Sequence, residues 1–217
     1  MSRILKKIDV YLVVDVSGSL SVVGSNLNKS LKEMKEIITQ NEELSGCEIK
    51  LNLITFNELK EVKIDFRNIN EIKPSEFELV YTGYTNPAPA LEYAANMAMK
   101  RYSVWKNDDG CECMHPIIFF FTDGRPEGNE SYQTEYERVA KNIKDLAGKK
   151  LSVVAAGYGY PDIENLKLLT ENVIMMEGND VKKLEKFFKH LIPATLVTGV
   201  TNTSWQIRNA FIKNIMR

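Results

Sequence analysis

The sequence predicts an α/β protein with a doubly wound, mostly parallel six-stranded sheet flanked by helices. Two runs are continuously apolar and rich in β-branched or aromatic residues, as strands buried on both faces are: Val10–Val14 and Pro116–Phe121. A third, Leu151–Ala156, is apolar apart from Ser152 and is also predicted to be a strand. Around them lie segments whose apolar residues recur at steps of three and four, the period of an amphipathic helix. Such strands in alternation with helices indicate a parallel sheet with both faces covered.

The first half of the chain supplies three strands and a helix. The strand at Val10–Val14 is followed by a helix over Asn26–Gln40, where Leu27 and Leu31 begin an apolar stripe. Ile49–Phe56 alternates between apolar and polar residues, as a strand does. Val62–Phe66 comes after a short turn and is predicted to pair with it.

The rest of the chain repeats the alternation. Pro89–Tyr102 is rich in Ala and Met and is predicted to be a helix. After the strand at Pro116–Phe121, the charged amphipathic segment Tyr132–Leu146 is predicted to be a further helix. The last predicted elements are a strand at Leu151–Ala156, a short helix at Ile163–Thr170, a strand at Val173–Met176 and a helix at Val181–Ile192.

Length and composition restrict the class of protein. A chain of 217 residues can bury about 70% of its surface, so it needs no disulfide or metal to form a core. We expect one domain over residues 1–196 and a tail over residues 197–217. The formal net charge of −1 and the lack of a basic stripe argue against a nucleic-acid-binding protein.

The sequence also bears on the location of the protein in the cell. Its three cysteines are an odd number and do not suggest a secreted disulfide framework. The first residues lack the apolar segment of a signal peptide, and no run approaches the roughly 18 apolar residues of a membrane span. We therefore expect a cytoplasmic protein without a membrane span.

Oxygen-bearing side chains follow the predicted strands where the strands end. Asp15, Ser17 and Ser19 alternate on the loop after the first strand, so their side chains can converge. Thr85 precedes the central helix, and Asp123 follows the strand that ends at residue 121. Ligands of such folds bind at the carboxyl ends of the strands, so we expect these five residues to lie together. Their oxygen atoms form a set suited to Mg²⁺, with Mn²⁺ or Ca²⁺ as alternatives.

Two simpler interpretations of these hydroxyls stay open. Serine is a common helix cap, so Ser17 and Ser19 could merely begin the helix after the loop. Thr82 lies three residues before Thr85 and could supply the hydroxyl in its place.

The two polar motifs resemble those of a known family. Asp15-Val16-Ser17-Gly18-Ser19, a central Thr85 and Phe121-Thr122-Asp123-Gly124 resemble the metal-ion-dependent adhesion site (MIDAS) of von Willebrand factor A-type (VWA) domains. The order of strands and helices is similar to that Rossmann-like fold from about residue 8 to residue 195. Within the family the chain most resembles the TerY group, which is associated with tellurium resistance and stress responses. The segments that carry this finer resemblance are Val10–Leu12, Thr122–Pro126, Val154–Gly159 and Phe187–Lys189.

The resemblance implies a role for each residue of the set. Ser17, Ser19 and Thr85 would ligate the metal directly or through water, and Asp15 and Asp123 would hold bound waters or the ion itself. The open position of the metal would accept a Glu or Asp from a partner protein. For TerY-like proteins the implied partners are protein kinases and phosphatases in a stress response.

Two positions depart from the family pattern. Leu20 stands where Met is common after the first motif, and this exchange should be neutral. Tyr84 stands where Gly often precedes the Thr, and its bulk bears on the conformation of that loop.

The alternative function is a divalent-metal hydrolase that acts on a phosphoryl substrate. Such an enzyme needs a general base or a water-orienting group beside the metal. The only histidines, His115 and His190, are far in sequence from the serine loop, and the GxxxxGK of a P-loop nucleotidase is absent. The sequence therefore favours a binding module that is not an enzyme.

Two further features have several interpretations. The segment Cys111-Glu112-Cys113-Met114-His115 could bind zinc together with Cys47, form a redox-reactive pair, or be an ordinary loop. Apolar and basic residues alternate in the tail between Trp205 and Arg217 and suggest a short amphipathic helix. That helix could pack on its own domain, aid docking or oligomerisation, or contact a membrane surface.

Overall fold

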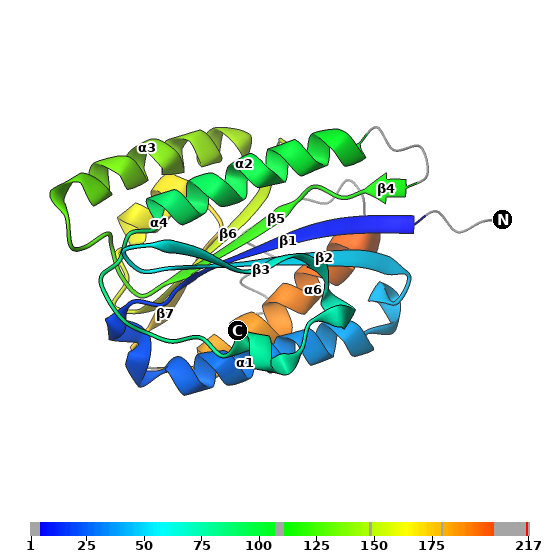
Figure 1. Cartoon of the computed structure of the whole chain (residues 1–217), viewed down its shortest axis with the longest axis horizontal. Coiled ribbons are helices and arrows are strands. Elements are labelled where there is room, and N and C mark those ends of the chain that lie inside the picture. Colours follow the sequence, from blue (N-terminus) through cyan, green and yellow to red (C-terminus); the bar gives the residue numbers. More distant parts are fainter. Residues whose placement is uncertain (1–4, 107–110, 148, 179, 202–215, 217) are drawn as a thin grey trace.

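The computed structural model describes residues 5–106, 111–147, 149–178, 180–201 and 216, and it places a twisted sheet between two layers of helices (Figure 1). The order across the sheet is β3-β2-β1-β5-β6-β7, and β4 pairs with β1. The strands are β1 (Leu5–Asp15), β2 (Cys47–Phe56), β3 (Lys60–Asn68), β4 (Cys111–Cys113), β5 (Ile117–Thr122), β6 (Ser152–Gly159) and β7 (Val173–Glu177).

Most strands of the sheet are parallel. Among the described strands, the edge strand β3 runs antiparallel to β2, whereas β2, β1, β5, β6 and β7 pair in parallel. The short β4 pairs with the start of β1, on the same side of β1 where β5 pairs with its later residues. It therefore extends β5 and adds no new position across the sheet. The predicted doubly wound, mostly parallel six-stranded sheet is confirmed, with β4 as an additional short strand.

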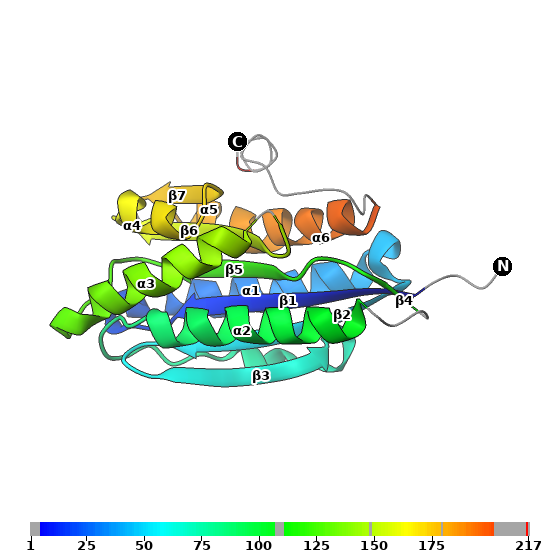
Figure 2. The same cartoon turned by 90° about the horizontal axis from the view of Figure 1, so that it is seen from above.

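Helices cover both faces of the sheet (Figure 2). The helices on one face are α1 (Gly24–Gln40), α5 (Val181–Lys186) and α6 (Ile192–Thr201). The helices on the other face are α2 (Ala88–Trp105), α3 (Glu130–Leu146) and α4 (Ile163–Leu169). Among the described helices, none combines the length and apolar character that a membrane crossing requires.

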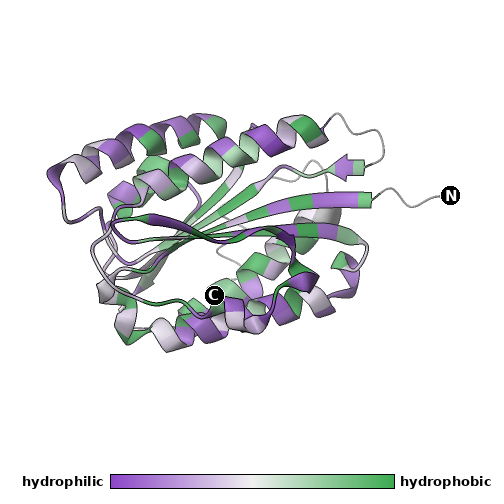
Figure 3. Cartoon of the chain, in the orientation of Figure 1, coloured by the Kyte–Doolittle hydropathy of each residue, from purple (hydrophilic) through white to green (hydrophobic). Residues whose placement is uncertain are grey.

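The strand β1 divides the hydrophobic core in two, because alternate residues of a strand face opposite sides. Val10, Leu12 and Val14 pack in the cluster that includes α1 and α6. Tyr11 and Val13 pack in the cluster that includes α2 and α3. Hydrophobic residues accordingly run along the central strands, whereas the helices mix hydrophobic and hydrophilic residues (Figure 3). This double coverage explains the continuous apolar runs of the sequence.

The last helical segment is longer than the sequence predicts. The helix expected to end at Ile192 continues through a π-helical turn, η5 (Phe187–Leu191), into α6, which reaches Thr201. Pro193 lies inside this continuous helix, two residues after the π-helical turn, and does not end it. Leu196 is fully buried in the core. The tail helix predicted between Trp205 and Arg217 lies outside the described residues, apart from Met216.

The topology creates a crevice between β1 and β5. The chain leaves β1 through α1 toward β2 on one side, and leaves β5 through α3 toward β6 on the other. Where the loops after two neighbouring strands depart in opposite directions, a gap opens at the carboxyl ends of the strands. Ligands of such folds bind in this gap. Asp15 is the last residue of β1 and Thr122 the last of β5, so both lie at this point.

Candidate metal centre

Asp15 lies at the bottom of the crevice with its side chain completely buried. The Thr122 hydroxyl donates to Asp15 Oδ2 at 2.6 Å, and the Ser17 N–H donates to Asp15 Oδ1 at 2.8 Å. Burial raises the pKa of Asp15 to about 6, the hydrogen bonds from Thr122 and Ser17 oppose the rise, and the charge of Asp123 adds to it. Both carboxylate oxygens are thus fixed in position, in a place where negative charge is costly.

Ser17 and Ser19 direct their hydroxyls toward each other, with the two Oγ atoms 3.1 Å apart. Ser17 is buried, whereas Ser19 is exposed. The Ser17 side chain makes no capping hydrogen bond to the 3₁₀ helix η1 (Gly18–Val22), Ser19 lies inside that helix, and Val23 precedes α1. The interpretation of these serines as helix caps is therefore wrong.

Backbone hydrogen bonds join the serine loop to the loop before α2. The Gly18 N–H donates to the Gly83 carbonyl at 3.0 Å, and the Thr82 N–H donates to the Val16 carbonyl at 2.8 Å. Gly83 has a φ of +78°, a conformation that side chains with a Cβ rarely adopt. The loop before α2 thus depends on glycine at this turn.

Thr85 is held against the loop that follows β5. Its N–H donates to the Glu127 carbonyl at 3.3 Å, and the Glu127 N–H donates back to the Thr85 carbonyl at 2.9 Å. Thr85 is buried and lines a cavity that Asp123 also lines, whereas Thr82 is exposed and does not line it. The Tyr84 side chain is 60% exposed, so its bulk does not displace Thr85 from the cavity.

Asp123 completes the set at the start of the loop after β5. Burial raises its pKa, and a hydrogen bond from the Ser19 hydroxyl opposes this rise. Ser19, Thr85 and Asp123 line one cavity of about 440 Å³. The structure thus brings the predicted residues together, Asp15 and Ser17 in the interior and the other three around the opening. Their role as metal ligands stays a prediction.

Besides Gly124 of the second motif, four residues that were not predicted as site residues line the same cavity: Arg125, Glu127, Tyr160 and Asp162. They belong to the loops after β5 and β6. Arg125 lies within the segment Thr122–Pro126, and the other three lie one to three residues beyond the segments named from the sequence. Arg125 is exposed and forms no ion pair with the described residues. Asp162 could have been found as a helix cap, because its Oδ1 accepts the N–H groups of Glu164 and Asn165 at the start of α4.

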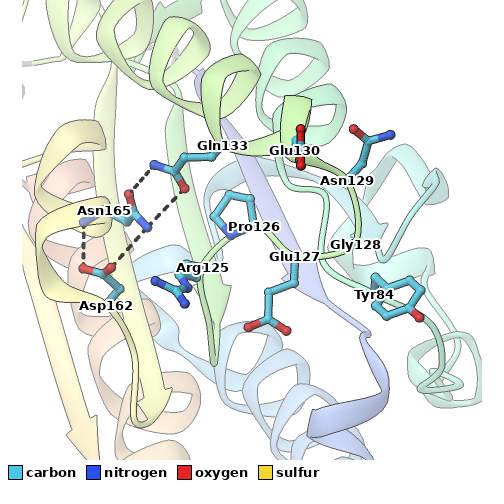
Figure 4. Close-up of a pocket in the computed structure, with 10 residues that line it drawn as sticks. All are labelled: Tyr84, Arg125, Pro126, Glu127, Gly128, Asn129, Glu130, Gln133, Asp162 and Asn165. Atoms are coloured by element: carbon cyan, nitrogen blue, oxygen red, sulfur yellow. Dashed lines mark hydrogen bonds between the residues drawn. The ribbon is translucent and has the colours of Figure 1, made fainter.

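A second hollow adjoins the first and has a volume of about 650 Å³ (Figure 4). It shares Arg125, Glu127 and Asp162 with the first hollow. Gln133 of α3 and Asn165 of α4 line its far end and are joined by a hydrogen bond of 2.8 Å. The two hollows therefore lie side by side, with Asp123 at one and these helices at the other.

The cysteines do not form the four-ligand zinc site that was one interpretation of the sequence. Lys6 of β1 pairs with Cys47 of β2 and with Glu112 of β4, so Cys47 faces the opposite side of the sheet from Cys111 and Cys113. No three His, Cys, Asp or Glu side chains are grouped to hold a metal anywhere in the described ranges. The candidate centre at Asp15 differs from such a group because three of its five members are hydroxyls.

Comparison with solved structures shows the same fold in proteins of low sequence identity. Proximal thread matrix protein 1 of the mussel byssus is 20% identical with a TM-score of 0.59, over 87% of this chain and 46% of that chain. The D319A mutant of the PilB minor pilin from Streptococcus sanguinis is 14% identical with a TM-score of 0.63, over 90% of this chain and 62% of that chain. The chain thus spans less than two thirds of these proteins.

One of these neighbours is recorded with a metal. A structure of the mussel protein with a zinc-occupied MIDAS motif is 13% identical with a TM-score of 0.55, over 90% of this chain and 48% of that chain. Among curated proteins, no sequence match was found. The family profile of the von Willebrand factor type A domain matches residues 9–190, which is most of the chain. The chain therefore belongs to the von Willebrand factor type A domain family.

Proposed function

We propose that this VWA domain is a protein-binding module that grips an acidic side chain of its partner through Mg²⁺. The hydroxyls of Ser17, Ser19 and Thr85 would ligate the ion, and Asp15 and Asp123 would hold it or its bound waters. The zinc in the MIDAS motif of the mussel protein supports a divalent metal at this motif. The oxygen-only set favours Mg²⁺, with Mn²⁺ or Ca²⁺ as substitutes.

Buried negative charge without a positive partner is the observation that carries this proposal. Asp9 and Asp15 are both buried, with 5% and 0% of their surface exposed. Asp9 Oδ2 lies 2.7 Å from Arg101 Nε, so its charge is compensated. Asp15 receives only neutral donors from the described residues, and Asp123 adds a second negative charge nearby. A divalent cation would supply the missing positive charge.

An apolar rim around the cavity favours a protein as the ligand. Tyr160 is 91% exposed and lines the cavity with Asp123, and Tyr84 is 60% exposed at the adjoining hollow. Val22, 77% exposed, lines a smaller hollow with Ser19 and Asp123. Exposed aromatic side chains around a polar centre are typical of protein interfaces, where they bury large areas at low entropic cost. A small phosphoryl substrate would have no use for this rim.

The positions of the two histidines give less support to a hydrolase than to a binding module. The ring of His115 packs against Tyr102 ahead of β5, at the end of the sheet away from the crevice. His190 lines a hollow with Asn41, beyond the far end of α1. Neither histidine lines the cavity at Asp123, so the module is proposed to bind and not to catalyse.

The finer proposal is that the module serves a stress response in the cytoplasm that is linked to phosphorylation or tellurite. The resemblance of segments such as Val154–Gly159 to the TerY group supports it, and the implied partner is a protein kinase or phosphatase. Co-purification of a kinase or phosphatase from the native organism, dependent on Mg²⁺, is the expected result.

Titration calorimetry with Mg²⁺ tests the metal site. Wild type should bind one ion, and Thr85→Ala should weaken binding at least about tenfold, because it removes a ligand. Thr82→Ala is the matched control, since its exposed hydroxyl lies outside the cavity. Equal affinities of wild type and Thr85→Ala would contradict the proposed site.

Capture from native lysate tests the partner. Wild type and Thr82→Ala should retain the same proteins in Mg²⁺ and lose them in EDTA, whereas Thr85→Ala should not retain them in either buffer. A captured set that is identical with and without EDTA would show that the metal does not bridge the two proteins.

A further inference from the structure

Cys111 and Cys113 bring two thiols together on one face of β4. Residues two apart on a strand point to the same side, and the two Sγ atoms are 3.3 Å apart. The Cys113 thiol lies 3.1 Å from the carbonyl oxygen of Trp105, the last residue of α2, and the Cys111 thiol lies 4.0 Å from it. Both cysteines are half-buried, so a small reagent can reach them.

This pair is separate from the metal centre. Cys111 pairs with Leu5, the first residue of β1, whereas Asp15 is the last residue of that strand. Ten steps of about 3.3 Å along β1 place the thiols roughly 33 Å from the candidate metal. Whatever the thiols bind is therefore independent of the proposed partner site.

The sulfur separation is poorly suited to a disulfide or to zinc. A disulfide needs an S–S distance of about 2.0 Å, and residues two apart on a strand already lie near the upper limit of Cα separation for such a bond. Two sulfurs on a tetrahedral zinc, each at about 2.3 Å, would be about 3.8 Å apart. A zinc site also needs further ligands, and the described residues offer no third His, Cys, Asp or Glu in a suitable group.

An atom that needs only two thiolate ligands fits the observed separation of the sulfurs better than zinc does. An atom bonded to both sulfurs at roughly 2.3 Å would subtend an angle of about 90° at the observed separation. This angle suits a pyramidal trivalent centre, which keeps one substituent besides the two sulfurs. Trivalent arsenic is such a centre, and it is soft and prefers thiolate ligands.

We propose that Cys111 and Cys113 form a dithiol site that captures a trivalent, thiophilic arsenical. In this reaction an arsenic-bound oxygen leaves as water with the two thiol protons, and two As–S bonds form. The arsenic and the sulfurs keep their oxidation states, so no oxidant or reductant is needed. Once one sulfur is attached, the second As–S bond forms within the molecule, which makes the chelate far more stable than an adduct to one thiol.

Phenylarsine oxide is the probe for this site. Reduced full-length protein is titrated in excess 2-mercaptoethanol, and the product is examined by intact mass and peptide mapping. We expect one adduct per chain, with the mass of phenylarsine oxide less one water, located on the peptide with residues 111–113. A dithiol such as 2,3-dimercaptopropanol should remove it.

Serine variants decide which thiols react. Cys111→Ser and Cys113→Ser should each lose the adduct that resists 2-mercaptoethanol, and Cys47→Ser, on the opposite face of the sheet, should keep it. A cooperative melting transition close to that of wild type in each variant shows that the fold is intact, and alanine variants replace any serine variant that fails this check. The proposal is overturned if wild type forms no resistant adduct, if either single variant keeps it, or if wild type merely loses two hydrogens to a disulfide.

Discussion

Asp15 makes the metal-free protein sensitive to pH through a single buried carboxyl group. Burial raises the pKa of Asp15 to about 6 in the folded state, above the 3.8 of an ordinary Asp carboxyl group, so the native state binds more protons between these values. Where the native state binds more protons, the free energy of unfolding falls as the pH rises. We expect Asp15 to lower the free energy of unfolding by at most about 3 kcal/mol as the pH rises from about 4 to about 6 in EDTA.

The difference in the free energy of unfolding between wild type and Asp15→Asn separates this contribution from that of the other carboxylates. Urea denaturation of both proteins in EDTA, from pH 4 to pH 7, gives the two stability curves. Asp15→Asn should gain stability relative to wild type as the pH rises toward about 6, and the difference should then level off. A difference that is constant with pH would show that the folded pKa of Asp15 is not raised.

Asp123 provides a second test at the level of one residue. Its charge raises the pKa of Asp15, and no described cation compensates the two carboxylates. Asp123→Asn should leave the metal-free protein unchanged or stabilise it by about 1 kcal/mol, because it removes a screened repulsion. The same substitution should abolish the Mg²⁺-dependent rise in melting temperature.

Melting curves of Asp123→Asn in EDTA and in excess Mg²⁺ distinguish two roles of this carboxylate. If Asp123 were a structural group satisfied by hydrogen bonds, the Asn variant would lose about 1–3 kcal/mol in both buffers. A clear loss of stability in EDTA together with an intact Mg²⁺ response would exclude Asp123 from the metal centre.

At the level of elements, the loop before α2 depends on the turn at Gly83. Its φ of +78° is costly for any residue with a Cβ, and an added Cβ would also lie 2.5 Å from the flexible carboxylate of Glu58. We expect Gly83→Ala to cost about 1–2 kcal/mol and to weaken Mg²⁺ binding, because Gly83 anchors the serine loop through Gly18. Thermal melting and Mg²⁺ titration measure the two effects.

Gly124→Ala is the matched control for this loop. Gly124 adjoins Asp123, yet a Cβ built there meets no atom within 4 Å, and its φ is not in the left-handed region. This variant should keep both the stability and the Mg²⁺ affinity of wild type to within a few tenths of a kcal/mol. If both variants behaved alike, the turn at Gly83 would have no special role.

The sequence predicts the elements well where burial dominates and less well where local chemistry is ambiguous. The runs that became β1 and β5 are apolar on both faces, and only a central strand has that environment. The extension of the last helix to Thr201 was missed, because Pro193 is a breaker in most helix interiors, whereas here the helix runs through it just after a π-helical turn. The residues at the crevice could be named because strand ends are local features. Tyr160 and Asp162 were not named, because the predicted strand stops at Ala156, whereas β6 continues to Gly159 and carries its carboxyl end to these two residues.

At the level of the whole molecule, the candidate centre joins parts of the chain that are remote in sequence. Asp15 ends β1, Thr85 precedes α2, and Asp123 follows β5, so the set links the two halves of the doubly wound sheet. An ion bound by all three loops is bound only by the folded protein. Its binding energy therefore adds to the stability of the entire domain.

Mg²⁺ should accordingly shift the unfolding of the domain as one transition. At an ion concentration of 100 times Kd, a ligand that binds only the native state stabilises it by about 2.7 kcal/mol. For a chain of this length, 1 kcal/mol corresponds to roughly 2–4 °C, so the melting temperature should rise by roughly 5–10 °C. Differential scanning calorimetry over a series of Mg²⁺ concentrations measures the shift, with Thr82→Ala expected to follow wild type and Thr85→Ala expected to lose most of it. The ion does not couple the loops to the core if calorimetric titration shows that Mg²⁺ saturates its site while the melting temperature stays constant. The same conclusion holds if unfolding splits into two transitions and Mg²⁺ shifts only one of them. The site would then be a local surface feature and not the junction of the two halves of the sheet.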